Sequence, residues 1–141
     1  MKYVLDASVA LKWVLAETDS AKANALRDDF RNQLCELLVP DVFPVEVAHA
    51  LTRAERKGII QPPQAIHLLA DVLSTPVTLH PYRSLLPRAV AISSVFRCGV
   101  YDCLYLALAE REGCAFVTAD DKLVKNLGTQ FPFIVALAAL P

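Results

Sequence analysis

The sequence contains little glycine, no excess of charge of either sign and no long uninterrupted hydrophobic run. Its 141 residues include 4 glycines, and 14 Lys and Arg nearly balance 15 Asp and Glu, leaving a net charge of −1. With 55 % hydrophobic residues, this composition excludes a disordered or low-complexity chain. The near-neutral charge excludes a global positive field, so any contact with nucleic acid must be local.

The apolar stretches are broken by Asp, Lys or Glu well before the roughly 20 residues that span a bilayer. We recognise no signal peptide or membrane anchor, and we therefore expect a cytoplasmic protein without a membrane partner. The chain also lacks the paired Cys and His spacing of a zinc site, and buried, reduced thiols are expected instead. The four cysteines are Cys35, Cys98, Cys103 and Cys114.

Short apolar runs typical of strands alternate with segments of helical period along the whole chain. The expected strands are residues 3–5, 37–39, 77–79, 115–117 and 133–135, and the expected helices are residues 8–15, 18–32, 41–57, 62–74, 85–96 and 101–112, with a further short helix from 120. Strands separated by helices indicate a parallel sheet, and strands without polar alternation indicate helices on both faces. We predict one domain over residues 1–141, with an α/β fold: a three-layer α/β/α arrangement around a central, mainly parallel sheet.

Three local features of the helices can be predicted from spacing. In the helix at 18–32, Arg27 falls on the side expected to face solvent. Asp41 is expected to cap the helix at 41–57 through its side chain. Trp13 is expected in the core or an interface.

Four acids fall where such a fold places its ligand crevice, outside the carboxyl ends of the strands. Asp6 directly follows the first expected strand, and Asp120 follows the strand at 115–117. Glu46 lies in the first turns of the helix after the second strand, and Asp102 opens a helix that is apolar on nearly every side. The four carboxylates are therefore expected to converge at one edge of the sheet.

Each acid also has a plainer interpretation, and for Asp6 it is that of an ordinary loop residue. Glu46, His49 and Arg53 can form a solvated stripe on one helix face, and Asp102 and Asp120 can serve as helix caps. Together they favour a metal site, because clustered carboxylates repel one another unless a divalent cation lies among them. Mg²⁺ or Mn²⁺ fits oxygen ligands best, and its chemistry of water activation points to a substrate that carries phosphates.

Four segments carry a family resemblance through their order and spacing. They are Val-Leu-Asp-Ala-Ser-Val at 4–9, Pro-Asp-Val-Phe-Pro-Val-Glu-Val-Ala-His-Ala-Leu at 40–51, Tyr-Asp-Cys-Leu-Tyr-Leu-Ala-Leu-Ala at 101–109 and Phe-Val-Thr-Ala-Asp at 116–120. Over essentially its whole length the chain resembles the PIN-domain ribonucleases, and most closely the VapC-type toxins of toxin–antitoxin pairs.

The resemblance implies a site and an activity. The implied catalytic residues are Asp6, Glu46, Asp102 and Asp120, with Asp6, Asp102 and Asp120 as metal ligands and Ser8, Thr118 and Asp121 in support. His49 stands where many relatives carry Asn. The implied activity is endonucleolytic cleavage of RNA, with Mg²⁺ or Mn²⁺ and no covalent enzyme intermediate. The implied partners are an RNA substrate, a small cognate antitoxin protein and a second copy of the chain.

RNA must be held by local positive charge, and several basic residues flank the acidic motifs. The candidates are Lys12, Arg53, Arg56, Lys57, Lys122 and Lys125. Basic residues on helix exteriors also serve simply as solvated surface.

Two other functions remain open from the sequence. A Mg²⁺-dependent phosphatase could use Asp6 as its nucleophile, but position 8, where such a site places a second Asp, holds Ser8. A catalytically silent interaction domain could keep the fold and use its acids only as helix caps.

Overall fold

The computed structural model describes residues 1–141 as alternating strands and helices. The strands are β1 (Lys2–Leu5), β2 (Glu36–Pro40), β3 (Thr78–His80), β4 (Ala115–Thr118) and β5 (Ile134–Ala136). The helices are α1 (Ala7–Leu11), α2 (Ser20–Arg31), α3 (Phe43–Arg56), α4 (Gln64–Leu73), α5 (Leu86–Phe96), α6 (Val100–Glu112) and α7 (Asp121–Leu127), with 3₁₀ turns at Arg83–Leu85 and Leu137–Ala139.

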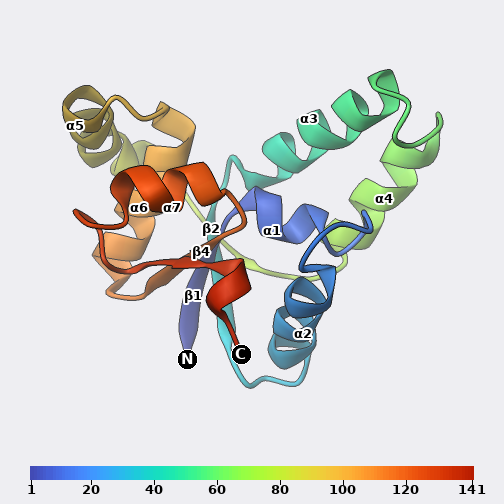
Figure 1. Cartoon of the computed structure of the whole chain (residues 1–141), viewed down its shortest axis with the longest axis horizontal. Helices are drawn as coiled ribbons and strands as arrows, with labels where there is room; N and C mark the ends of the chain where they lie inside the picture. Colours follow the sequence, from blue (N-terminus) through green and yellow to red (C-terminus); the bar gives the residue numbers. More distant parts are fainter.

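The five strands form one sheet in the order β3-β2-β1-β4-β5, and every neighbouring pair is parallel. Helices α1 to α4 lie on one side of the sheet and α5 to α7 on the other (Figure 1), which confirms the predicted three-layer α/β/α fold. The chain moves outward from β1 through β2 to β3, then crosses to β4 and β5. The strand order therefore reverses between β1 and β4, where open parallel sheets form their ligand crevice.

Helix α6 lies at the centre of the molecule, against β1, β2 and β4, and α5 packs on it. Its residues Cys103 to Ala109 are all buried, as expected for a helix without a polar face. They belong to one cluster of 34 buried residues that runs through both layers of helix. No single helix has the length and apolar character to cross a membrane, and the only combination that does, Arg83–Phe96 with Val100–Glu112, is bent by 119°.

Helix α1 is shorter than the expected segment at 8–15. After Leu11 the backbone N–H groups of Lys12, Trp13 and Val14 bond to the carbonyl three residues earlier, so the helix tightens into turns. The tightening directs Trp13 inward, where its side chain is buried and its indole N–H donates to the carbonyl of Ala23 at 2.9 Å. Trp13, which was expected in the core or an interface, is therefore a core residue.

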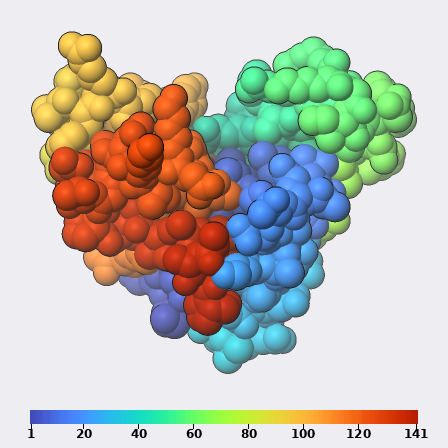
Figure 2. Space-filling view, in the orientation of Figure 1, coloured from blue at the N-terminus to red at the C-terminus, as the bar shows by residue number.

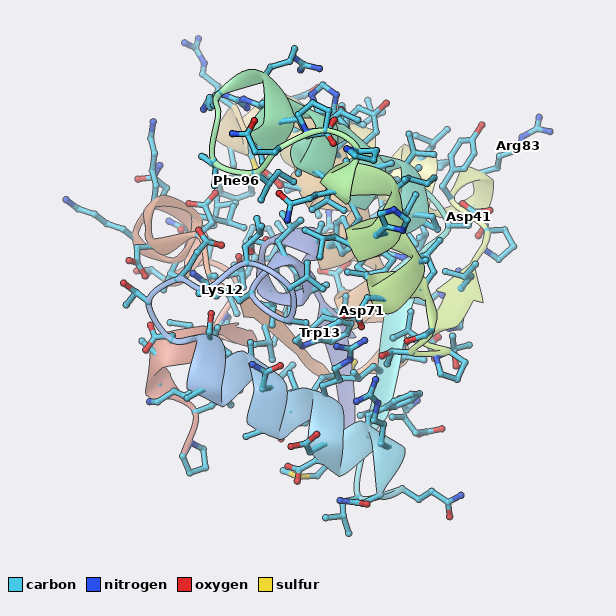
Figure 3. All side chains as sticks on the ribbon, turned by 90° about the vertical axis from the view of Figure 1, so that its right-hand side faces the viewer. Lys12, Trp13, Asp41, Asp71, Arg83 and Phe96 are labelled. Atoms are coloured by element: carbon cyan, nitrogen blue, oxygen red, sulfur yellow. The ribbon has the colours of Figure 1, made fainter.

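The predicted solvent position of Arg27 is wrong. Its side chain is buried, and its guanidinium donates to Thr75 Oγ1 at 2.7 Å, to the Asp71 carbonyl at 2.7 Å and to Asp71 Oδ1 at 2.8 Å. The same group lies 4.8 Å from the ring centroid of Trp13. Trp13 and Asp71, both labelled in Figure 3, lie close together around this guanidinium. Arg27 thus ties α2 to α4.

The predicted cap of α3 is also wrong. The N-cap residue is Val42, and no side chain caps this helix. The carboxylate of Asp41 instead accepts a hydrogen bond from the backbone N–H of Tyr82 at 3.0 Å. Asp41 therefore holds the segment that follows β3. Its partner Tyr82 lies 41 residues away, so the local sequence pattern does not reveal this contact.

Candidate active site

All four predicted acids line one cleft of about 530 Å³. Asp6 reaches it from the end of β1, Glu46 from the first turn of α3, Asp102 from the first turn of α6 and Asp120 from the start of α7. Figure 2 shows the cleft as a notch between the green surface of α3 and α4 and the yellow to orange surface of α5 to α7. Four acids that are distant in the sequence therefore line one cleft at the carboxyl edge of the sheet.

Asp6 is held by both residues predicted to support it. Its Oδ2 accepts hydrogen bonds from Thr118 Oγ1 at 2.6 Å and from Ser8 Oγ at 3.0 Å. These hydroxyls are themselves positioned by the backbone, because Ser8 Oγ accepts from the N–H of Ala119 and Thr118 Oγ1 from the N–H of Asp120. Burial raises the pKa of Asp6, and the two hydroxyl hydrogen bonds offset only part of that rise.

Asp120 and Asp102 differ in how they relate to their helices. Asp120 caps α7, as its plainer interpretation predicted, with Oδ1 accepting from the N–H of Leu123 at 3.2 Å. Capping uses one oxygen and leaves the other for a ligand. Asp102 does not cap α6, because Gly99 is the N-cap residue. Burial, together with the charges of Asp6 and Asp120, raises the pKa of Asp102 to about 6.

Glu46 is half-buried rather than part of a solvated stripe. Its Oε1 accepts a hydrogen bond of 2.7 Å from the hydroxyl of Tyr105, a residue of α6 that is fully buried. Burial and the charges of Asp6 and Asp102 raise the pKa of Glu46, and the Tyr105 hydroxyl works in the opposite direction. The pKa of Tyr105 is itself raised by burial and by Glu46, so the phenol stays protonated and remains a donor.

Tyr105 was missed by the sequence reasoning, although the sequence contains a signal for it. It lies three residues after Asp102, and side chains at this spacing share one face of a helix. It is also the only hydroxyl within the buried run of α6. A buried phenol needs an acceptor, and in this fold the acceptor is a carboxylate of the cleft.

The remaining predicted residues are distributed unevenly. His49 lines the cleft together with Leu11 and Tyr101, whereas Asp121 is exposed and does not line it. A smaller hollow of about 250 Å³ adjoins the cleft at Asp102 and Asp120 and is called the side pocket below. Of the six basic candidates only Lys122 lines either hollow; the others are Lys12, Arg53, Arg56, Lys57 and Lys125. Their contact with RNA stays a prediction.

The donor set suits a hard divalent cation, although the side chains are not gathered around one point. No three Asp, Glu, His or Cys side chains lie close enough together to hold a metal ion as they stand. All four acids nevertheless offer carboxylate oxygens to one cleft, and the carboxylate of Asp102 has no hydrogen-bond or ion-pair partner. Three of the four have pKa values raised by burial, with the negative charge of neighbouring acids adding to the rise. A cation among them would relieve that repulsion.

Comparison with known proteins identifies the family. The family model of the PIN domain matches residues 3–127. The curated protein Ribonuclease VapC3 of Pyrobaculum aerophilum is 30 % identical over 137 residues, covering 96 % of this chain and 98 % of that protein. The similarity therefore spans both chains almost completely.

Solved structures share the fold at lower identity. The crystal structure of PAE2754 from Pyrobaculum aerophilum has a TM-score of 0.71 and 20 % identity, covering 98 % of this chain and 93 % of the other. A toxin–antitoxin complex from Klebsiella pneumoniae contains a chain with a TM-score of 0.65 and 14 % identity, with coverage of 96 % and 97 %. The match to residues 3–127 and the nearly full-length relative show that this chain belongs to the PIN-domain family, as its four sequence segments predicted.

Proposed function

We propose that the protein is a metal-dependent endoribonuclease and the toxin of a toxin–antitoxin pair. The observation that carries the proposal is the single cleft lined by Asp6, Glu46, Asp102 and Asp120, in a chain whose relatives include a VapC ribonuclease. A phosphatase that uses Asp6 is disfavoured, because position 8 holds a serine whose hydroxyl bonds to Asp6 in place of a second acid.

The residues divide the work according to their surroundings. Asp6, Asp102 and Asp120 would hold Mg²⁺ or Mn²⁺, and the hydroxyls of Ser8 and Thr118 keep the Asp6 carboxylate in a fixed orientation. When bound there, such a cation would neutralise phosphate charge and favour ionisation of the attacking water. Glu46 lies on the opposite wall, and its raised pKa suits it to accept a proton from the attacking water.

The partners follow from the same family relation. The solved complex from Klebsiella pneumoniae pairs a toxin with an antitoxin, and this supports an antitoxin protein as a partner of this chain. We also propose a homodimer, because large apolar side chains such as Ile66 and Val95 are left exposed in the single chain.

The proposal is tested by incubating purified protein with total RNA and mapping the new ends. We expect cleavage at defined positions with Mg²⁺ or Mn²⁺, complete loss with EDTA and recovery when Mg²⁺ is added in excess. Asp6→Asn should cut nothing, and calorimetry should show weaker Mn²⁺ binding by this variant. Equal cleavage by wild type and Asp6→Asn would mean that the site is not this cleft, and cleavage in EDTA would refute metal dependence.

Tyr105→Phe tests the support of Glu46. The variant keeps the ring, which stacks on Phe116 with centroids 5.9 Å apart, and removes only the hydroxyl that donates to Glu46. Without that donor the pKa of Glu46 rises further, so we expect the acid limb of the pH profile of RNA cleavage to move to higher pH. We expect kcat to fall about tenfold at neutral pH, with little change in KM.

The matched control is Tyr82→Phe, which removes a hydroxyl from an exposed tyrosine outside the cleft. Its pH profile should coincide with that of wild type. A Tyr105→Phe variant with an unshifted profile would show that the phenol serves packing alone.

A further inference from the structure

Asp102 and Asp120 lie between the cleft and the side pocket, which differ in the charged residues that line them. They line the cleft on one side and the side pocket on the other. The side pocket is bounded by the turn between α5 and α6 and by the first turns of α7. Any chain that passes over these two carboxylates therefore enters the side pocket directly.

The positive charge beside the acids is confined to the side pocket. Arg97 and Lys122 line it, together with the side-chain amide of Asn126, whereas no Lys or Arg lines the cleft. Both cations are exposed, and neither forms an ion pair with a carboxylate. They are therefore not present as counter-ions of the acids and remain available to an anion from solution.

The cations are attached to the same short segments as the acids. Arg97 ends α5 in the left-handed conformation, at φ 55°, and its N–H bonds to the Ser93 carbonyl. The Ser93 hydroxyl in turn donates to the Cys98 carbonyl at 2.5 Å, which fixes the turn that leads into α6 and Asp102. Lys122 follows Asp120 by two residues in the first turn of α7. The backbone of each cation therefore lies in an ordered turn that also leads to one of the acids.

We propose that the side pocket binds the phosphate adjacent to the one that is cleaved, with Arg97 and Lys122 as its cations and Asn126 as a neutral donor. The inference rests on the proposed function. When one phosphate of an RNA strand lies at Asp102 and Asp120, the next phosphate must lie in a neighbouring hollow. The side pocket can neutralise that charge with charge-assisted hydrogen bonds, and the cleft, with its acids and apolar wall, cannot.

Binding is measured with a fluorescent single-stranded RNA of mixed sequence, in the Asp6→Asn background so that the probe stays intact. We expect Arg97→Gln and Lys122→Gln each to weaken binding about tenfold at low salt. Replacing both should reduce the slope of log K against log salt by about 0.7, the value for one phosphate on a single strand, and each single variant should account for part of that reduction. The matched control is Arg31→Gln, an exposed arginine at the end of α2 that lies near the amino ends of β1 and β2, away from the side pocket.

The position of the phosphate is tested with cleavable RNA that carries one uncharged methylphosphonate linkage at a time. In wild type we expect a single position next to the cleavage site where the neutral linkage lowers kcat/KM about tenfold. In the double variant Arg97→Gln/Lys122→Gln the same linkage should have little further effect, because both cationic contacts are already absent. Arg97→Lys should retain most of the effect, which separates charge from folding of the turn.

The outcomes are distinct. The inference is overturned if Arg97→Gln and Lys122→Gln bind RNA as tightly as Arg31→Gln does. It is also overturned if the loss of kcat/KM in these variants adds to the loss from a neutral linkage equally at every position. If wild type cuts no RNA but binding still depends on Arg97 and Lys122, the side pocket is supported and the proposed nuclease activity is wrong.

Discussion

Asp102→Asn is expected to lower RNA cleavage at least about a thousandfold and, at the same time, to make the metal-free protein more stable. The loss follows because the amide cannot replace a carboxylate as a ligand of a hard cation. The gain follows because Asp102 is partly buried beside Asp6 and Asp120 with no partner of opposite charge. Where clustered acids bind a cation at the cost of stability, removing one acid should lower activity and raise the stability of the metal-free protein.

The sign of the pH dependence separates the two effects. The pKa of Asp102 is about 6 in the folded chain, above its ordinary value of 3.8, so the folded state binds this proton more tightly than the unfolded state. The free energy of unfolding should therefore fall as the pH rises from about 4 to about 6. The part due to Asp102 is on the order of 1 kcal/mol, because solvent screens a partly exposed carboxylate. In Asp102→Asn this part of the fall should disappear.

The measurement is urea unfolding with EDTA at pH 4.5 and pH 7, together with cleavage of a mapped RNA. Asp28→Asn, at an exposed position on α2, is the matched control and should behave like wild type in both assays. A variant that keeps its activity would remove Asp102 from the site. A variant that loses activity and stability together would make Asp102 a structural residue.

The strands and the positions of the acids could be predicted because both depend on local pattern. Asp6 and Asp120 follow short apolar runs, and in a parallel sheet the ends of such runs meet at one edge. Asp102 stands out because it is a charged residue directly before the buried run Cys103–Ala109 of α6. In each case the neighbouring residues contain enough information to place the side chain.

The features that sequence reasoning missed depend on partners far along the chain. Helical period places Arg27 in solvent, but Asp71 and Thr75, 44 and 48 residues later, supply the acceptors that allow its burial. The hydroxyl of Tyr105 and the carboxylate of Glu46 are 59 residues apart. A pattern within one helix cannot reveal such pairs, because the acceptor is brought there by the packing of another element.

Among the residues that the sequence pattern places in solvent, Arg27 should have the largest effect on the free energy of unfolding when it is replaced. Arg27→Met fills similar space beside Trp13 but removes the donor to Thr75 Oγ1 and to two oxygens of Asp71. Thr75 is only 3 % exposed, so water cannot readily replace the lost partner of its hydroxyl. We expect the free energy of unfolding to fall by about 2–4 kcal/mol, measured by urea titration.

Two further variants assign that loss to its causes. Asp71→Asn removes a carboxylate whose side chain is 50 % exposed, and we expect it to cost less than about 1 kcal/mol. Arg27→Lys keeps the charge but lacks the planar fork that serves three acceptors, and it should recover little of the loss. If Arg27→Lys restores full stability, charge alone holds α2 to α4. If Arg27→Met is as stable as wild type, apolar packing on Trp13 compensates for the hydrogen bonds, and the tie between the two helices is not polar at all.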